Sequence, residues 1–256
     1  MIYIFLPVYN EEENIFELLS SIEKFWNEQM KYESISIVIV NDGSSDQTHL
    51  KIKEFEEKYK LNSNSNFKIS YIQHKINTGL GSAVKTGFEH IIADNNNAKN
   101  ILVTMDGDNS HLITNIKTLI SNIRNQYKVS ICSRYVEGNI VKGVPFSRII
   151  IANIGSLIFQ LFFPIKGVKD FTCGYRAYDL QFLTEVFNSN NDMFSEKNFT
   201  CQADILIKLY KFDNSFKAKE IPINLRYDLK KGQSKMRLSQ NILATLILIF
   251  KRKFDL

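Results

Sequence analysis

Two carboxylates lie two positions apart at the end of an apolar run near the middle of the chain. The run Ile101–Met105 is followed directly by Asp106, Gly107 and Asp108. Carboxylates this close repel each other unless a cation or strong hydrogen-bond donors offset their charge. Mg²⁺ and Mn²⁺ prefer such oxygen ligands, which they usually share with substrate phosphates. The pair therefore indicates a divalent metal site, although Asp-Gly pairs also occur in exposed turns.

Three further polar loops have a similar composition. They are Pro7–Glu11, Asn41–Asp46 and Asn77–Ala83. Glycines at the start of a helix can bring backbone N–H groups close to a phosphate. The third loop carries Gly-Leu-Gly and lacks both the dinucleotide-binding and the P-loop patterns, so it is weak support for NAD. The four loops together predict a nucleotide-sized crevice with a divalent cation and no hydride cofactor.

Apolar runs alternate with helical patterns through the first half of the chain. Strands are expected near Met1–Leu6 (ended by Pro7), Ile35–Val40, Phe67–Gln73, Ile101–Met105 and Lys128–Cys132. Helices are expected between them, and Asn10 is expected to cap the first one, beginning in the acidic run Glu11–Glu13. This alternation is typical of an α/β fold with a mostly parallel, doubly wound sheet, whose strand ends line one crevice.

Two apolar segments mark the second half of the chain. Phe146–Val168 is broken by polar residues and is either a half-buried helix or one in a membrane interface. Leu238–Phe250 is too short to cross a bilayer, and it ends in the basic run Lys251–Lys253. Such a helix can lie on an anionic membrane surface. We therefore expect a main domain over residues 1–237 and an amphipathic, membrane-interfacial helix over residues 238–256.

The composition is ordinary for a soluble globular protein, with 44% hydrophobic and 23% charged residues. The three cysteines have no metal-ligand spacing, which favours a reduced compartment, and the N-terminus lacks the pattern of a signal peptide. Residues 1–127 carry a net charge of −4 and residues 128–256 a net charge of +9. The basic half indicates an anionic partner, such as a phosphate, a nucleic acid or an acidic membrane surface, unless its lysines are simply solvated.

Seven short motifs follow one another along residues 1–237. They are PVYNE (Pro7–Glu11), NDGSSDQT (Asn41–Thr48), NTGLGSA (Asn77–Ala83), DGD (Asp106–Asp108), SRY (Ser133–Tyr135), DFTCGYRAY (Asp170–Tyr178) and GQSK (Gly232–Lys235). In this order they resemble the family 2 glycosyltransferases, and most closely the enzymes that transfer a sugar to dolichyl or polyprenyl phosphate. The resemblance implies a GT-A fold and an inverting, metal-dependent transfer from a nucleoside-diphosphate sugar, with GDP-mannose favoured.

The resemblance also implies roles for individual residues. The donor sugar nucleotide is expected to meet Pro7, Tyr9, Glu11, Asp42, Asn77, Gly79 and Asp106. The acceptor phosphate is expected to meet Arg134, Arg148, Ser234 and Lys235. A Mg²⁺ or Mn²⁺ ion is expected on Asp106 and Asp108, and the catalytic candidates are Asp106, Asp108 and Arg134. Without the resemblance, Arg134 and Arg148 would be interpreted as surface cations.

Several positions depart from the family pattern. Asn41 stands where Asp is common, and Ala152 stands where Ser is frequent. Ser110 replaces a Gln that often helps to bind the metal, so the third metal ligand stays open. Asp204 matches a frequent acidic position, and it is either a site carboxylate or a helix-surface acid paired with a lysine.

The chemistry expected for such an enzyme agrees with the split charge. A polyprenyl phosphate is already an anionic nucleophile, so cations that hold two phosphates together matter more than a strong base. No C-terminal pair of spanning helices is seen, and in this the chain resembles the peripheral members of the family. We therefore expect a protein on the cytoplasmic face of a membrane that can use an anchoring membrane subunit. We expect no nucleic-acid partner. Two alternatives remain: the same fold acting on a glycan or protein hydroxyl group, and a non-catalytic lipid-docking protein.

Overall fold

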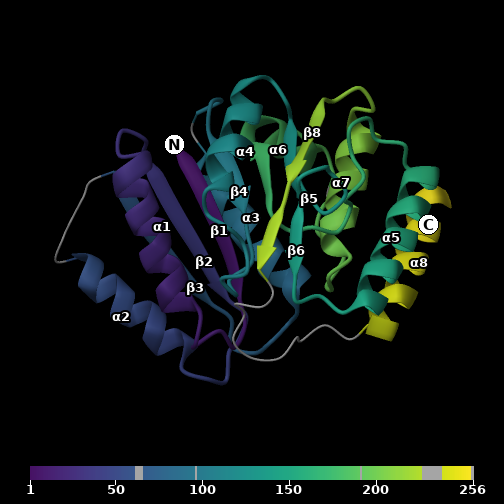
Figure 1. The fold of residues 1–256 in the computed structure, drawn as a ribbon. Coiled ribbons are helices and arrows are strands. Elements are labelled where there is room, and N and C mark those ends of the chain that lie inside the picture. Colours follow the sequence, from purple (N-terminus) through teal and green to yellow (C-terminus); the bar gives the residue numbers. More distant parts are fainter. Residues whose placement is uncertain (61–65, 96, 191, 227–237, 255–256) are drawn as a thin grey trace.

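The computed structural model describes residues 1–60, 66–95, 97–190, 192–226 and 238–254 (Figure 1). The strands are β1 (Ile2–Val8), β2 (Ile35–Asn41), β3 (Phe67–Gln73), β4 (Ile101–Thr104), β5 (Val129–Ser133), β6 (Ile140–Lys142), β7 (Arg176–Asp179), β8 (Ala218–Pro222) and β9 (Asn224–Arg226). The helices are α1 (Ile15–Gln29), α2 (Thr48–Lys60), α3 (Leu80–Asp94), α4 (Asn115–Arg124), α5 (Phe146–Phe162), α6 (Leu180–Ser189), α7 (Cys201–Phe212) and α8 (Leu238–Phe254).

The central sheet has the strand order β3-β2-β1-β4-β7-β5-β8. Its neighbouring strands are parallel, except that β7 runs antiparallel to both β4 and β5. The predicted mostly parallel α/β sheet is therefore confirmed. Strand β7 was not among the expected strands, and its first three residues belong to the motif DFTCGYRAY. Its polar ends, Arg176 and Asp179, hide the strand in the sequence, yet the Arg176 side chain is fully buried.

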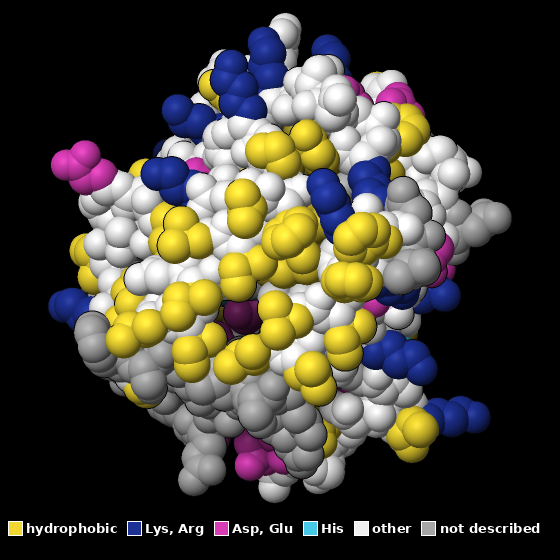
Figure 2. Space-filling model, turned by 90° about the vertical axis from the view of Figure 1, so that its right-hand side faces the viewer, with side chains coloured by type: hydrophobic (Ala, Val, Ile, Leu, Met, Phe, Trp, Pro, Cys, Tyr) yellow, Lys and Arg dark blue, Asp and Glu magenta, His cyan; other side chains and the backbone are white. Residues whose placement is uncertain are grey.

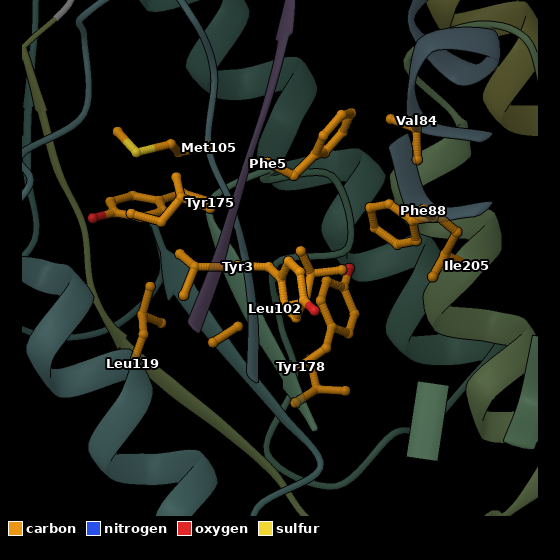
Figure 3. Packing of buried hydrophobic residues seen from close by; sticks show 14 of the residues in the cluster. Tyr3, Phe5, Val84, Phe88, Leu102, Met105, Leu119, Tyr175, Tyr178 and Ile205 are labelled. Atoms are coloured by element: carbon orange, nitrogen blue, oxygen red, sulfur yellow. The ribbon is translucent and has the colours of Figure 1, made fainter. Parts of the chain in front are cut away.

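The hydrophobic core lies on both faces of this sheet (Figure 3). Leu119 of α4 lies on one side of the strands, whereas Val84 and Phe88 of α3 lie on the other. Phe88 contacts Phe5 of β1 edge to face, with ring centroids 5.6 Å apart. Two helical layers thus cover a sheet that is apolar on both faces, as continuous apolar strands such as β2 require.

Two local predictions at the N-terminus were wrong. Strand β1 does not end before Pro7 but continues to Val8, with Pro7 opposite Val40 in β2. Asn10 does not cap α1, which begins at Ile15. Asn10 instead adopts a left-handed backbone conformation, with φ at 53°. Its side chain accepts a hydrogen bond from the loop after β2 rather than from the start of a helix.

Helices α5 and α8 pack on each other at one edge of the molecule (Figure 1). Helix α8 begins at Leu238 as predicted and continues to Phe254, and its residues Leu248 and Ile249 are buried. Within the described part of the chain, no helix combines the length and the apolar character needed to cross a bilayer. Helix α5 is half buried, because Phe159 is buried while Leu157 and Leu161 are exposed.

Candidate active site

The loops that follow β1 and β2 are joined by hydrogen bonds at the carboxyl edge of the sheet. The N–H group of Asn10 donates to Ser44 Oγ at 2.9 Å, and the side chain of Asn10 accepts from the N–H group of Ser45 at 2.8 Å. The N–H group of Glu11 donates to Thr48 Oγ1 at 2.8 Å. The motifs PVYNE and NDGSSDQT, which are far apart in the sequence, therefore lie side by side at this edge of the sheet.

Asp42 fixes the glycine segment that follows β3. Its buried carboxylate accepts hydrogen bonds from the N–H groups of Thr78 at 3.0 Å and Gly79 at 2.8 Å, and His74 Nδ1 lies 2.7 Å away. Gly79 has a φ of 96°, which favours glycine, and its N–H group points back at Asp42. These N–H groups already have acceptors in the protein. The Gly79 N–H group is therefore already bonded within the protein. The predicted contacts of Asp42, Gly79 and the exposed Asn77 with a nucleotide stay predictions.

The two candidate metal carboxylates have different environments. Asp108 is buried, and its Oδ1 atom accepts hydrogen bonds from the N–H group of Ser110 at 3.1 Å and from its hydroxyl at 2.6 Å. The Asp106 side chain is 49% exposed, and its Oδ2 atom lies 3.8 Å from His111 Nε2. Ser110, which replaces the Gln of the family pattern, thus orients Asp108.

This donor set suits a hard divalent cation. Asp106 and Asp108 offer carboxylate oxygens in one loop, and Mg²⁺ or Mn²⁺ would complete its coordination with water and donor phosphate oxygens. Among the residues that the structure describes, no group of three or more Asp, Glu, His or Cys side chains is placed to hold a metal ion. A metal site made of these two carboxylates and of substrate phosphates would need no third protein ligand of this kind.

His111 contacts the loop Asp106–Asp108, which is the candidate metal loop. Its ring is buried and stacks on the Tyr175 ring, with centroids 4.8 Å apart and planes 14° apart. Its Nδ1 atom faces the N–H group of Asp106 at 3.4 Å. His74 and His111, which lie outside the seven motifs, thus both contact carboxylates of the candidate site.

Arg134 lies directly after β5 and is held by a buried acid. Its Nη2 and Nε atoms donate to the two carboxylate oxygens of Asp170 at 2.6 and 2.8 Å, and Nη2 also donates to Thr172 Oγ1 at 2.6 Å. Burial alone would raise the pKa of Asp170, but the charge and hydrogen bonds of Arg134 outweigh it and lower that pKa. The Arg134 side chain is still 27% exposed, so a ligand can reach it.

The loop from Asp170 to Gly174 connects Arg134 with the metal loop. Asp170 at its start holds Arg134. At its end, a Cβ atom built on Gly174 would lie only 3.2 Å from Asp106 Oδ1. The structure therefore brings the candidate metal acid and a candidate acceptor-binding cation to the two ends of one five-residue loop.

The remaining predicted site residues fall into two groups. Pro7 lies in β1, Tyr9 follows it, and Glu11 is buried and accepts a hydrogen bond from Asn14 at 2.7 Å. Arg148 lies in the first turn of α5, but its side chain is outside the described part. Ser234 and Lys235 also lie outside the described residues, so their predicted contact with the acceptor phosphate stays a prediction.

Comparison with known proteins identifies the family. Residues 3–187 match the model of glycosyl transferase family 2, and the chain belongs to this family. It is 34% identical over 175 residues to a dolichol-phosphate mannosyltransferase from Pyrococcus furiosus. The matched region covers 68% of this chain but only 45% of that enzyme. The chain thus spans less than half the length of that relative.

Two further relatives match over most of their length. A polyprenol monophosphomannose synthase from Mycolicibacterium smegmatis is 26% identical, with 91% of this chain and 80% of that protein covered. A UDP-N-acetylglucosamine–dolichyl-phosphate N-acetylglucosaminyltransferase from Methanococcus voltae is 27% identical, with 89% and 86% covered. The chain is therefore similar to enzymes with different sugars in their names.

A solved structure supports the fold. Glucosyl-3-phosphoglycerate synthase from Mycobacterium tuberculosis, in complex with Mn²⁺, UDP and phosphoglyceric acid, superimposes with a TM-score of 0.66 at 13% identity. The superposition covers 99% of this chain and 78% of the synthase chain. The fold is GT-A-like, and the protein is a glycosyltransferase. The alternative of a non-catalytic lipid-docking protein was wrong.

Proposed function

We propose that this glycosyltransferase moves a sugar from a nucleoside-diphosphate sugar to a polyprenyl or dolichyl phosphate, with inversion at the anomeric carbon. The observation that carries the proposal is the loop from Asp170 to Gly174. It positions the Arg134 guanidinium at one end and borders Asp106 at the other. A donor diphosphate and an acceptor phosphate could then lie side by side. The names of the Pyrococcus and Mycolicibacterium relatives support this acceptor class.

The reaction needs charge stabilisation more than proton transfer. A phosphate oxygen of the acceptor attacks the anomeric carbon and forms a new C–O bond, while the bond from that carbon to the donor diphosphate breaks. Because the attacking oxygen is already anionic, no general base is required. Arg134 would bind the acceptor phosphate through its guanidinium group while Asp170 keeps that group in place. Asp106 and Asp108 would hold Mg²⁺ or Mn²⁺, which supplies positive charge to the leaving diphosphate.

GDP-mannose is the donor that we propose. Two relatives whose names specify mannose transfer support it, namely those from Pyrococcus and Mycolicibacterium. The relative from Methanococcus voltae is named for UDP-N-acetylglucosamine, so the donor has to be tested directly. A binding screen by thermal shift with GDP-mannose, UDP-glucose and UDP-N-acetylglucosamine in Mn²⁺ distinguishes them, because a bound donor raises the melting temperature.

We propose further that the enzyme lies on the cytoplasmic face of a membrane, with α5 and α8 against the lipid. Both helices expose large hydrophobic side chains on the same side of the molecule, and we call this surface the apolar face. Its residues are Ile149, Ile150, Ile154, Leu157, Leu161 and Phe162 of α5 and Ile242, Leu243, Leu246, Ile247, Phe250 and Phe254 of α8. Figure 2 shows hydrophobic side chains across the middle of this view, with Lys and Arg side chains around them. Exposed patches of this kind mark membrane or protein contacts.

The basic end of α8 contributes less to this surface than its sequence predicts. Lys251 pairs with Glu196 at 3.4 Å, and Arg252 pairs with Asp192 at 3.2 Å and with the buried Asp204 at 2.6 Å. These cations are thus engaged within the protein. Apolar contact would therefore supply most of the affinity for the membrane, at about 25 cal/mol per Å² of apolar surface. The C-terminal helix acts together with α5 in this proposal, rather than as a separate extension.

The proposed function is tested by a transfer assay with the purified chain. Labelled GDP-mannose, polyprenyl phosphate in detergent and Mn²⁺ should give labelled lipid, and omission of either the lipid or the metal should abolish it. Label on a soluble glycan or peptide, and none on the lipid, would favour the hydroxyl-acceptor alternative instead. Activity that appears only after a membrane protein is added back would assign the apolar face to an anchoring subunit.

A further inference from the structure

Gly174 lies between two polar side chains that leave little room for a side chain of its own. A Cβ atom on this residue would lie 3.2 Å from Asp106 Oδ1 and 3.5 Å from Gln202 Nε2. The Gly174 carbonyl accepts a hydrogen bond from Thr104 Oγ1 at 2.6 Å, which ties the loop to the end of β4. The Asp106 carboxylate and the Nε2 end of the Gln202 carboxamide, at the start of α7, thus both lie close to the Cβ position that Gly174 leaves unfilled.

Gln202 is buried, and its carboxamide is incompletely bonded. The residue is 5% exposed, and its Oε1 atom has no hydrogen-bond partner in the part of the chain that the structure describes. Its backbone is firmly placed, because the Arg176 guanidinium donates to the Gln202 carbonyl at 2.8 Å. A buried acceptor without a partner destabilises the folded protein, and so needs an explanation beyond packing.

The position of this carboxamide matches one part of the donor. If Asp106 and Asp108 hold the metal on the donor diphosphate, the transferred sugar lies next to the metal loop. Sugar hydroxyl groups both donate and accept hydrogen bonds, and a carboxamide offers both functions in one plane. Asp106 alone offers only acceptors when it is ionised.

We propose that Gln202 binds a hydroxyl group of the transferred sugar, and that Gly174 is a glycine because any side chain there would fill the sugar's place. This inference rests on the proposed function and identifies a residue that neither the motifs nor the metal loop pointed to. Gln202 would act on the sugar and not on the nucleotide. Its loss should therefore weaken the binding of a sugar nucleotide while it leaves the binding of the free nucleoside diphosphate unchanged.

Calorimetric titration tests this difference. The wild-type protein is first titrated in Mn²⁺ with GDP and GDP-mannose and with UDP and UDP-glucose. Each variant is then titrated with the pair of ligands that the wild-type protein binds. In Gln202→Leu, the dissociation constant of the sugar nucleotide should rise at least tenfold, and that of the diphosphate should change less than twofold. Gly174→Ala should also raise the dissociation constant of the sugar nucleotide at least tenfold, because its methyl group occupies the proposed place of the sugar. Since this methyl group would lie 3.2 Å from Asp106 Oδ1, Gln202→Leu is the variant that separates sugar binding from diphosphate binding.

Two matched variants control for folding and for the substitutions themselves. Gly155→Ala adds a methyl group where no atom lies within 4 Å, and Gln181→Leu removes an exposed carboxamide in α6. Both should bind like the wild-type protein, and all variants should have melting temperatures close to the wild type. Equal loss of both ligands in Gln202→Leu, or unchanged binding of the sugar nucleotide in either variant, would overturn the inference. A wild-type protein that binds neither ligand would overturn the proposed function, and the inference with it.

Discussion

The Nε atom of Arg252 in α8 donates a hydrogen bond to the buried carboxylate of Asp204 in α7 at 2.6 Å. Lys208, one turn further along α7, lies 2.7 Å from the same carboxylate. Asp204 therefore lies at the centre of an ion-pair network that joins α8 to the core. Of the two interpretations of Asp204 from the sequence, the pairing with a lysine agrees with the structure, although the pair is buried rather than on the helix surface.

Asp204→Asn should lower the free energy of unfolding by about 3–5 kcal/mol, because the buried Lys208 and the partly buried Arg252 lose their shared counter-charge. Chemical denaturation at neutral pH measures this loss. Glu54→Gln is the matched control: Glu54 forms an exposed ion pair with Lys51, and its loss should cost less than about 1 kcal/mol. Equal effects of the two substitutions would show that the network contributes little to stability.

Asp170 gives the protein a defined dependence of stability on pH. Burial raises the pKa of this carboxyl group, but the Arg134 guanidinium outweighs burial and holds the pKa below the ordinary value for Asp. The ionised form therefore stabilises the fold fully above about pH 4, the ordinary Asp pKa, and this contribution is lost as the pH falls towards the lower folded-state pKa.

Asp170→Asn removes that contribution. The variant should be less stable than the wild type at pH 7, and the difference should shrink as the pH is lowered below about 4. Denaturation curves at pH 7, 5, 4 and 3 measure it. A difference that stays constant over this range would contradict the assigned ionisation of Asp170.

Arg134→Lys should separate charge from geometry in acceptor binding. Lysine keeps the positive charge, but it cannot bond both oxygens of Asp170 and a phosphate with a planar fork. We expect a fall of about 10²-fold in kcat/KM for polyprenyl phosphate, which corresponds to about 2.7 kcal/mol, with little change in donor binding. Steady-state kinetics with the lipid as the varied substrate measure this fall, with donor affinity determined separately. An equal loss of donor affinity would place Arg134 at the diphosphate instead.

The apolar face predicts membrane binding by the folded protein. Leu157 in α5 is 66% exposed and Leu243 in α8 is 61% exposed, so their replacement by Glu should leave the fold intact. The double variant should lose most of its flotation with vesicles of mixed neutral and anionic lipids, because two charges would have to enter the interface. Leu50→Glu is the control, since Leu50 is 61% exposed on α2, away from this face. Unchanged flotation of the double variant would exclude the apolar face as the membrane contact.

The sequence was sufficient to predict the parts of the fold that follow from local patterns. Apolar runs such as Ile35–Val40 predicted the parallel strands, and the polar loops that follow them lie at the carboxyl edge of the sheet as expected. The class of enzyme followed from the order of the motifs. Strand β7 was missed because Arg176 is charged, and its burial depends on carbonyl partners from Phe171 and Gln202 that lie outside the strand.

Long-range contacts in the site were not predictable either. No spacing shows that Asp42 holds Gly79, or that the Gly81 N–H group donates to the Lys197 carbonyl at 2.8 Å. Asn10 was assigned to a helix cap because Asn is common there, but its partners come from a loop about 35 residues later. Gln202 carried no sequence signal, and only its position beside Gly174 pointed to it.

In the proposed reaction, a metal ion held by Asp106 and Asp108 supports sugar transfer to a lipid phosphate. The most direct measurement compares the wild-type protein with Asp108→Asn in the transfer of labelled mannose from GDP-mannose to polyprenyl phosphate. We predict Mn²⁺-dependent labelled lipid with the wild-type protein, and a loss of at least about 10³-fold with Asp108→Asn. Labelled lipid formed equally by both proteins, or formed without a divalent metal, would contradict this proposal.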